Sequence, residues 1–243
     1  MDRMIYLSMS GAKATMQRQD TLANNLANAS TVGFRAELQA FRSVPIEGDG
    51  ASTRVFSLET TPGYDSSQGP LQQTGKNLDV AMKGDAWLAV QALDGTEAYT
   101  RAGSMEVNAD GTLVTPGGLQ VLGDGGPITI PQDADIAIAA DGTISARDTA
   151  GKTTPVGKLK MVTPETNLIR GDDTLFRAAD NAPLDADPAA RLQSGALEGS
   201  NVSAVQTMVS MISAARQFET QMKLMQTAEA DDKAAGQLLN ISG

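Results

Sequence analysis

The stretch LANNLANASTVGFR, residues 22–35, places Asn24, Asn25 and Asn28 in what the residue pattern predicts to be the last turns of an amphipathic helix. Asparagine tolerates helix ends because its amide bonds exposed backbone groups, and Gly33 permits a turn out of the helix. This explains a helix end, but not amides a full turn earlier, at Asn24 and Asn25. We interpret these amides as groups that hydrogen-bond across a packed bundle without the desolvation cost of a charge.

A heptad pattern leads into this stretch. Residues at alternating steps of four and three form one narrow stripe, in which Gln19 is the polar member. The stripe consists of Ile5, Met9, Ala12, Met16, Gln19, Ala23 and Leu26. We expect a helix over about residues 4–28, which would reach roughly 37 Å at 1.5 Å per residue.

The C-terminal segment repeats the pattern, again with one polar member, Glu219. Its stripe consists of Val205, Met208, Ile212, Ala215, Glu219, Met222 and Met225. Ser200 or Asn201 caps this helix, or Ser203 and Gln206 form a capping box, and the sequence does not choose between them. We expect Gln19 and Glu219 to set the register of the packed helices, a known use of polar seam residues.

Methionine is concentrated in the same two segments, which hold eight of the eleven in the chain. Thioether side chains fill irregular gaps, so a methionine-rich seam suits an interface with several slightly different neighbours. An ordinary helical hairpin that covers the central domain explains the periodicity equally well. The spacing therefore leaves open whether the stripes pack between chains or within one.

The prolines divide the chain, because all ten lie between Pro45 and Pro188. Proline breaks helix interiors, so proline-free ends around a Pro- and Gly-rich middle indicate helix, β and helix. We predict an α+β fold with N- and C-terminal coiled-coil-forming helices enclosing a central, mainly antiparallel β domain. The expected parts are an assembly helix and turn over 1–35, an extended connection over 36–77, the β domain over 78–198 and a second assembly helix over 199–243.

Apolar alternation in the middle flanks three Asp-Gly dipeptides, at residues 94–95, 110–111 and 141–142. Asp-Gly favours tight hairpin turns because glycine accepts positive φ. The alternating residues are the expected core of the β domain. They are Trp87, Leu88, Val90, Ile128, Ile130, Ile136, Ile138 and Ile144.

Composition argues against several classes of function. The net charge is −10 and the 19 basic residues are scattered, which argues against nucleic acid as a partner. The chain has no cysteine and no histidine, which removes disulfides, thiolate and imidazole ligands, and Ser-His or Cys-His catalysis. No apolar run approaches the roughly 20 residues of a membrane span, and the start lacks the apolar core of a signal peptide. We expect no catalytic residue, cofactor, metal, small-molecule substrate or membrane insertion.

Weaker signals remain. Residues 69–77, GPLQQTGKN, superficially resemble a phosphate loop, but the glycine spacing is one residue too long and Asn77 replaces the magnesium-binding Ser or Thr. Three acid pairs leave a carboxylate-only periplasmic hydrolase as a weak alternative. These pairs are Asp133/Asp135, Asp172/Asp173 and Asp231/Asp232.

Basic residues in and after the first helix are a further candidate for subunit contacts. Lys13, Arg18, Arg35 and Arg42 can pair with acids on a neighbouring subunit, although most such surface charges face water.

Three stretches carry a family resemblance. LANNLANASTVGFR, residues 22–35, resembles the N-terminal signature of bacterial flagellar rod and hook proteins. EGSNVSAVQTMVSMISAARQFETQMKLM, residues 198–225, resembles their C-terminal helix. Residues 78–118, LDVAMKGDAWLAVQALDGTEAYTRAGSMEVNADGTLVTPGG, resemble their β domain. The likeness covers most of the chain in the expected order. MDRMIYLSMSGA at the start and ARQFETQMK in the last helix are most similar to proximal rod proteins.

The resemblance implies a non-enzymatic subunit of the basal-body rod, which spans the periplasm. It implies terminal helices packed as the inner layer of a tubular rod, with the β domain outside and torque passing through the helices. Other rod subunits, including the distal rod protein FlgG, and the flagellar type III export apparatus are the implied partners. A distal rod or hook-type subunit is the nearest alternative, and a secreted adhesin or cap-like module is a further one.

The expected subunit interface combines the two stripes with the asparagines and Phe218. If these seams are buried mainly against other subunits, the isolated ends should be weakly helical and fold during assembly. The interface residues are Ile5, Met9, Ala12, Met16, Gln19, Ala23, Asn24, Asn25, Leu26, Asn28, Val205, Met208, Ile212, Ala215, Phe218, Glu219, Met222 and Met225.

Overall fold

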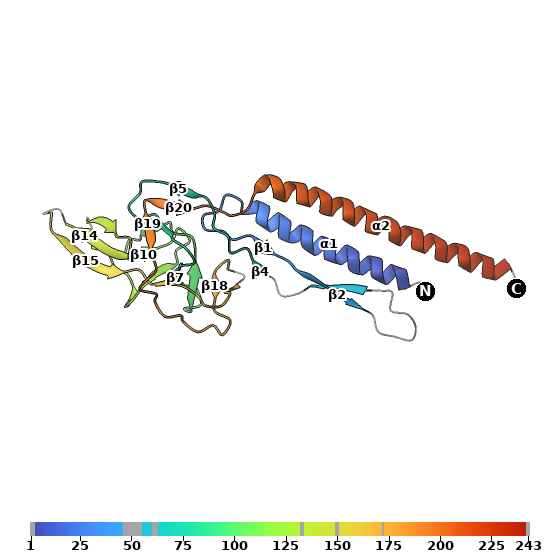
Figure 1. Ribbon diagram of the computed structural model, residues 1–243, viewed down its shortest axis with the longest axis horizontal. Coiled ribbons are helices and arrows are strands. Elements are labelled where there is room, and N and C mark those ends of the chain that lie inside the picture. The colour runs from blue at the N-terminus through green and yellow to red at the C-terminus, as the bar shows by residue number, and fades with distance from the viewer. Residues whose placement is uncertain are drawn as a thin grey trace. The chain divides into compact units, whose positions relative to one another are not determined.

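The computed structural model describes residues 3–45, 55–59, 63–131, 134–148, 151–171 and 173–241. The chain forms two compact units, each of which is described by itself. The helical unit contains Met1–Ala29, Ala36–Asp65 and Val202–Gly243, and the β unit contains Ser30–Arg35 and Ser66–Asn201. Terminal helices and a central set of strands, visible in Figure 1, confirm the predicted α+β class.

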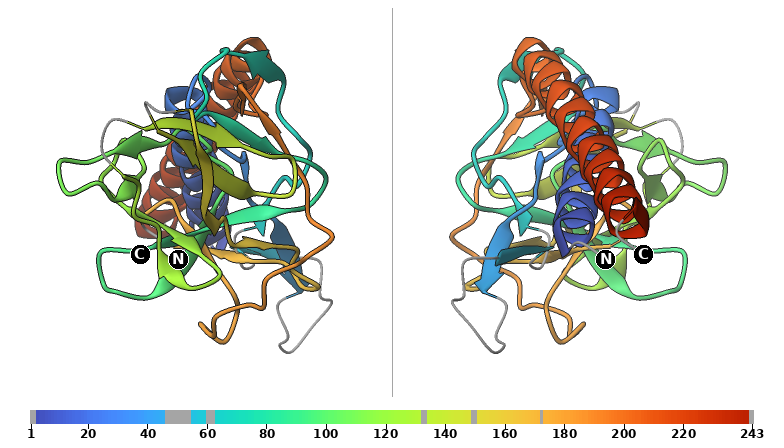
Figure 2. Two further views of the ribbon diagram at one scale, coloured as in Figure 1. Left: turned by 90° about the vertical axis from the view of Figure 1, so that its left-hand side faces the viewer. Right: turned by 90° about the vertical axis from the view of Figure 1, so that its right-hand side faces the viewer.

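Two helices dominate the helical unit. α1 spans Arg3–Ala27 and α2 spans Ala204–Ile241, and the two lie side by side in the views of Figures 1 and 2. Ser203 caps α2: its carbonyl accepts hydrogen bonds from the N–H and the hydroxyl of Thr207, both at 2.9 Å, and its own Oγ accepts the Gln206 N–H at 3.5 Å. Of the residues that the sequence offered as the cap of this helix, Ser203 is the one that caps it in the structure.

Four short strands follow α1 in the same unit. They are β1 (Glu37–Leu38), β2 (Phe41–Pro45), β3 (Val55–Glu59) and β4 (Gly63–Tyr64). β2 pairs with β3 and β1 with β4, both antiparallel, and β3 contacts α1. Strands β1 to β4, which lie in the segment expected to be an extended connection, thus form two ladders in the unit of the helix.

The β unit contains a nine-stranded sheet, a three-stranded sheet and two separate ladders, and every strand pair is antiparallel where the structure describes the chain. The large sheet has the order β17-β18-β8-β7-β11-β10-β9, with β12 beside β11 and β16 beside β7. The small sheet is β13-β14-β15, and the ladders are β19-β6 and β20-β5. The strands are β5 (Leu71–Gln73), β6 (Val80–Met82), β7 (Trp87–Gln91), β8 (Glu97–Thr100), β9 (Glu106–Val107), β10 (Leu113–Val114), β11 (Gln120–Gly123), β12 (Gly126–Pro127), β13 (Asp135–Ile138), β14 (Thr143–Arg147), β15 (Thr153–Lys158), β16 (Met161–Val162), β17 (Ile169–Arg170), β18 (Phe176–Arg177), β19 (Leu192–Ser194) and β20 (Ala196–Glu198).

The core of the β unit is the predicted one. All eight residues expected inside are buried, and β13 shows the alternation plainly: Ile136 and Ile138 point inward while Asp135 and Ala137 are exposed. The ring of Trp87 packs on that of Phe176 with centroids 4.7 Å apart. The period-two pattern therefore identified the buried face of the strands.

The three Asp-Gly dipeptides form turns of one design. The N–H of Ala92, Asn108 and Ala139 donates to the carbonyl four residues on, at 2.9, 3.0 and 2.9 Å. The turn glycines have φ between 79° and 86°. This matches a three-residue hairpin loop with glycine in the left-handed region.

Carboxylates fix two of these turns. Asp94 accepts hydrogen bonds from the hydroxyl and the N–H of Thr96, at 2.6 and 2.9 Å, and Asp141 accepts the same pair from Thr143, at 2.9 and 3.1 Å. Because these bonds favour the ionised form, the pKa of each carboxyl is lowered, mainly by the Thr96 hydroxyl for Asp94 and by the Thr143 N–H for Asp141.

The lowered pKa of Asp141 makes a prediction for Asp141→Asn, which keeps an acceptor but loses the charge. The ionised carboxylate stabilises the fold above its unfolded pKa, and this contribution disappears as pH falls through the lower folded pKa. We expect Asp141→Asn to be less stable than the parent at pH 7 and equally stable near pH ~2. Urea unfolding followed by the fluorescence of Trp87 measures this, with Asp124→Asn on another exposed turn as control. A difference of the same size at both pH values would contradict the prediction.

Candidate functional site

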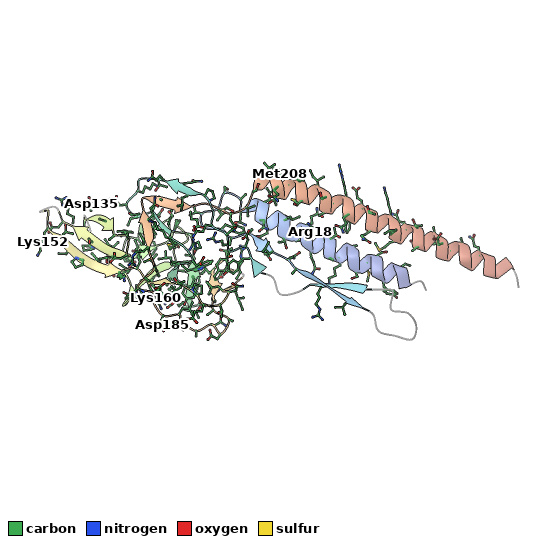
Figure 3. The ribbon with its side chains drawn as sticks, in the orientation of Figure 1. Arg18, Asp135, Lys152, Lys160, Asp185 and Met208 are labelled. Atoms are coloured by element: carbon green, nitrogen blue, oxygen red, sulfur yellow. The ribbon has the colours of Figure 1, made fainter. Side chains whose placement is uncertain are left out.

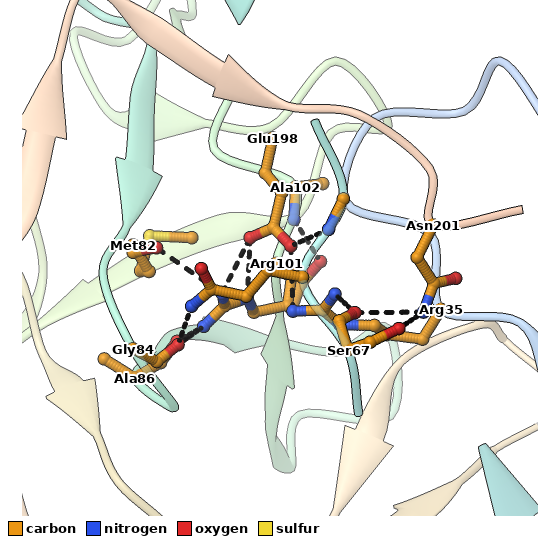
Figure 4. A network of polar contacts seen from close by, with 12 residues as sticks. Arg35, Ser67, Met82, Gly84, Ala86, Arg101, Ala102, Glu198 and Asn201 are labelled. Atoms are coloured by element: carbon orange, nitrogen blue, oxygen red, sulfur yellow. Dashed lines mark hydrogen bonds and ion pairs between the residues drawn. The ribbon is translucent and has the colours of Figure 1, made fainter. Parts of the chain in front are cut away.

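Three segments far apart in the sequence meet within the β unit. They are residues 30–35, which follow α1; residues 66–69; and residues 196–201, which lead to α2. The Gly33 N–H donates to the Glu198 carbonyl at 2.7 Å, and the Asn201 N–H donates to the Phe34 carbonyl at 3.3 Å. Figure 4 shows the polar network at this junction. We call its three buried charged residues, Arg35, Arg101 and Glu198, the clamp.

The carboxylate of Glu198 is the centre of the clamp. Its Oε1 lies 2.8 Å from Nη2 of Arg35 and accepts the Gly69 N–H at 3.0 Å. Its Oε2 lies 2.7 Å from Nη2 of Arg101 and accepts the Nε–H of Arg101 at 2.9 Å. All three side chains are at most 3% exposed. Both oxygens are thus occupied by charge-assisted hydrogen bonds, the strong kind, in a water-poor site.

Arg101 directly follows β8. Its remaining N–H groups donate to backbone carbonyls at the end of β6 and in the turn between β6 and β7. Its Nη1 donates to the carbonyl of Gly84 at 2.9 Å and to that of Ala86, and its Nη2 donates to that of Met82 at 3.4 Å. The guanidinium lies 5.8 Å from the centroid of the Trp87 ring. One side chain therefore joins Glu198 to the entrance of the central strand β7.

Arg35 anchors the segment that follows α1. Its Nη1 donates to the Ser67 carbonyl, which also accepts the side-chain amide of Asn201 at 3.0 Å. The guanidinium of Arg170 lies 4.5 Å from the centroid of the Phe34 ring and donates to the Arg35 carbonyl at 3.2 Å. This segment is held on both sides by groups of the β unit.

Two glycines allow the backbones to approach this closely. Gly33 has φ +68°, and a Cβ there would lie 2.3 Å from the backbone nitrogen of Ala102. A Cβ on Gly69 would lie 2.0 Å from the carbonyl oxygen of Gly199. Both distances are too short for any side chain, so glycine is required where the segments cross.

The expectation for Arg35 was wrong: it is buried and pairs with Glu198 of its own chain, whereas Lys13, Arg18 and Arg42 are exposed. Sequence reasoning also missed Arg101 and Glu198. In β20, Ala196 and Glu198 are buried and Leu197 between them is half-buried, so a glutamate and not the leucine takes the inward position. Burial of a charge depends on partners that are distant in sequence, which periodicity does not reveal.

The predicted helix interface divides into two sets within a single chain. Most of the bulky members are exposed, and the rest are buried or half-buried. The exposed members are Met9, Met16, Ala23, Asn24, Val205, Met208, Ile212, Glu219 and Met222. Buried are Ala12 and Asn25, and half-buried are Ile5, Gln19, Leu26, Asn28, Ala215, Phe218 and Met225. Whether the exposed members contact other subunits stays a prediction.

The buried face of the helices carries mostly small or polar residues. On α1 these include Ser8, Ala12 and Thr15, and a Cβ on Gly11 would lie 3.2 Å from the Gln221 side chain of α2. On α2 the less exposed residues recur at steps of four and three. They are Thr207, Met211, Ala214, Phe218, Gln221, Met225 and Ala228. This stripe lies beside the predicted one and shares Met225 with it. The other bulky members of the predicted stripe are exposed, as Met208 in Figure 3 illustrates.

Asn24, Asn25 and Asn28 lie at the C-terminal end of α1. The Nδ2 of Asn25 donates to the Glu37 carbonyl at 2.9 Å, and its Oδ1 accepts the Glu37 N–H at 2.8 Å. Asn28 donates to the Asn24 carbonyl at 2.9 Å. The amide of Asn25 thus imitates a strand neighbour for β1 in its own chain, which corrects the expectation that it bonds across a bundle.

The weaker chemical signals have structural explanations where the structure describes them. Residues 69–77 contain β5 instead of a phosphate loop. Asp135 accepts a hydrogen bond from Asn77 and Asp173 pairs with Arg177, whereas Asp133 and Asp172 lie outside the described residues. Among the described residues, no cluster of acidic side chains is suited to a metal ion. In the same residues, no helix has the length and apolar character of a membrane span.

Comparisons with known proteins match all three signature stretches. The model of the flagella basal body rod protein matches residues 5–35, that of the flagellar hook protein FlgE/F/G D1 domain matches 81–146, and that of the flagellar basal body rod FlgEFG protein C-terminal matches 193–238. The flagellar basal-body rod proteins FlgF of Salmonella typhimurium and Escherichia coli are each 48% identical over the whole of both chains. The chain belongs to the flagellar basal-body rod protein family. It is a structural protein of the flagellar basal-body rod, and its family is not one of enzymes.

A more distant relative is the rod protein FlgG of Bacillus subtilis, 34% identical over 98% of each chain. Each of the three matched regions contributes one residue to the clamp: Arg35 lies in the first, Arg101 in the second and Glu198 in the third. The clamp is therefore the point where the N-terminal, β and C-terminal parts of this rod protein join.

Removal of the central carboxylate tests the clamp. Glu198→Gln leaves two buried guanidinium groups without a counter-charge, so we expect a loss of ~3–5 kcal/mol in the free energy of unfolding. Urea unfolding followed by Trp87 fluorescence measures the loss, and Glu165→Gln, at an exposed site, is the matched control. A Glu198→Gln protein within ~1 kcal/mol of the parent would show that the clamp does not hold the β unit together.

Proposed function

We propose that this chain is a proximal rod subunit that polymerises through its terminal helices and passes motor torque through them to and from its β unit. Membership of the rod family and full-length similarity to FlgF proteins support the proximal position. The relation to FlgG keeps a distal rod or hook-type subunit as the alternative.

The outward stripe of α2 is the observation that carries this proposal. Val205 is 70% exposed and Ile212 is 55% exposed, while the fully buried residues of α2 are small or polar and the larger ones beside them, Met211, Phe218 and Met225, are only half-buried. Burial of one such aliphatic side chain is worth about 1.5–3 kcal/mol. Packing against neighbouring subunits would therefore bury apolar side chains that packing within one chain leaves exposed.

The clamp supplies the connection between these helices and the β unit. A subunit that transmits torque needs both helix connections held firmly, because a loose connection would absorb the load as bending. Arg35 and Glu198 stand in the two connecting segments and bind each other, and Arg101 ties them to the sheet. Removal of either partner leaves an uncompensated buried charge, so the joint resists opening.

The composition supports export through the flagellar type III apparatus, the proposed partner before assembly. A chain threaded unfolded through a narrow channel is hindered by disulfides, and this chain has no cysteine. After export, we expect the helix stripes to become ordered against the neighbouring rod subunits, including FlgG at the distal side.

A charge in the outward stripe tests helix-mediated assembly. We expect Ile212→Asp to abolish rod assembly and motility while the urea unfolding of the β unit, reported by Trp87, is unchanged, because the carboxylate cannot be buried between subunits. Gln217→Asp adds the same charge on another exposed face of α2 and should assemble normally. Motile cells that carry Ile212→Asp together with Met16→Asp would refute the proposal.

The position along the rod has its own test. Electron microscopy of basal bodies from a deletion strain should show a rod interrupted in its proximal part. A complete proximal part that lacks only the distal rod would support the FlgG-like alternative, and an intact rod would overturn the assignment to the rod.

A further inference from the structure

The methionines of this chain differ in exposure between its two units. Met82, Met105 and Met161, the three methionines of the β unit, belong to its core and are at most 3% exposed. Four methionines of the helical unit are 37–57% exposed, and we call them the exposed thioethers. They are Met9, Met16, Met208 and Met222. An oxidant in solution therefore reaches sulfur atoms on the helices, while those of the β unit are shielded by the core.

The exposed thioethers lie on the predicted helix stripes. Met9 and Met16 are seven residues apart on α1, and Met208 and Met222 are fourteen residues apart on α2. Because both separations are whole heptads, each pair lies on one side of its helix. On α2 this side also carries the exposed Val205. The thioethers thus belong to the surface that the proposed function buries between subunits.

Oxidation changes how a thioether behaves in an apolar contact. A hydroperoxide transfers one oxygen atom to the sulfur, which loses two electrons and becomes a sulfoxide, while hydrogen peroxide is itself reduced to water. The sulfoxide oxygen is a polar acceptor, and burial without a donor is costly. One turn before Met222, the polar member of the stripe is Glu219, whose carboxylate only accepts hydrogen bonds. A sulfoxide at Met222 therefore gains no donor from this neighbour.

We propose that the exposed thioethers form an oxidation site that controls assembly. A hydroperoxide converts them to sulfoxides in the unassembled subunit, and a subunit that carries the sulfoxides does not enter the rod. The β unit keeps its fold, because its own methionines are buried. The block is reversible, since methionine sulfoxide reductases restore the thioether. The inference rests on the proposed assembly through the helices and adds a chemical control of that step.

Hydrogen peroxide applied to the purified full-length chain tests which sulfur atoms react. We expect mass spectrometry of its peptides to find sulfoxide at the exposed thioethers well before it appears at Met82, Met105 and Met161, because accessible thioethers react first. The urea unfolding of the treated chain, reported by Trp87, should match that of the untreated chain. Equal rates of oxidation in the two sets of methionines would overturn the proposal.

Cells that build rods in the presence of hydrogen peroxide test the effect on assembly. With the parent chain, we expect new rods in electron micrographs of basal bodies to become about tenfold rarer, the effect of losing one well-buried apolar contact. The variant Met9→Leu/Met16→Leu/Met208→Leu/Met222→Leu, which replaces every exposed thioether, should keep its rods. The matched control Met211→Leu/Met225→Leu, at half-buried positions of α2, should lose rods as the parent does. Equal loss with all three chains would count against the proposal.

Glutamine at the same four positions gives a readout without an oxidant, because its amide imitates the polarity of the sulfoxide. We expect Met9→Gln/Met16→Gln/Met208→Gln/Met222→Gln to make rods about tenfold rarer, while its urea unfolding matches the parent. If this variant forms rods normally while Ile212→Asp blocks assembly, the oxidation proposal fails and the rod function stands. If Ile212→Asp also forms rods normally, assembly through the helices fails with it.

Discussion

A single carboxylate, that of Glu198, compensates two guanidinium groups that are buried in the β unit. Removing charges from water is costly, and such a group is tolerated only when its partners satisfy its hydrogen bonds. Here the carbonyls of Met82 and Gly84 accept further hydrogen bonds from the guanidinium of Arg101. The network therefore forms only when the segments before α2, after α1 and around β6 are all in place. This requirement determines where the two helices leave the β unit.

The two helices bury small and polar side chains and leave several bulky apolar ones exposed. A helix pair that stabilises itself buries its bulky apolar residues, yet Met208 and Ile212 of α2 point outward and Thr207 and Ala214 point inward. Hydroxyl groups on the inner face bond their own helix, as Thr207 does to Ser203 at 2.9 Å, so they can be buried without a partner on the other helix. This arrangement is the one that the proposed assembly through neighbouring helices requires.

The features that could be predicted from the sequence are those that depend on the local spacing of apolar residues and on turn-forming residues. The two terminal helices, the Asp-Gly hairpins and the core from Trp87 to Ile144 all followed from spacing and from the conformational freedom of glycine. The inward faces of the helices were harder to predict. Small polar residues such as Ser8 and Thr15 line the inner face of α1, and an apolar pattern does not include them. On α2 the apolar period therefore marks mainly the outward face, whereas on α1 four of its seven positions, Ile5, Ala12, Gln19 and Leu26, are buried or half-buried.

The clamp was beyond such reasoning for a different reason. Arg35 and Glu198 are 163 positions apart, and an isolated arginine or glutamate in a polar stretch is by default a surface residue. The same limit applies to strands β1 to β4, which lie in the segment expected to be a connection and form ladders in the same unit as α1. Long-range pairing decides both cases, and composition carries no information about it.

The position of the clamp has a mechanical consequence. Because α1 and α2 lie near the two ends of the chain, a force on either end acts on a helix before it reaches the β unit. The last residues on the way to the strands are Gly33 and Arg35 after α1, and Asn201 and Glu198 before α2. From either side, the force therefore meets the same buried ion pair before it can load the sheet.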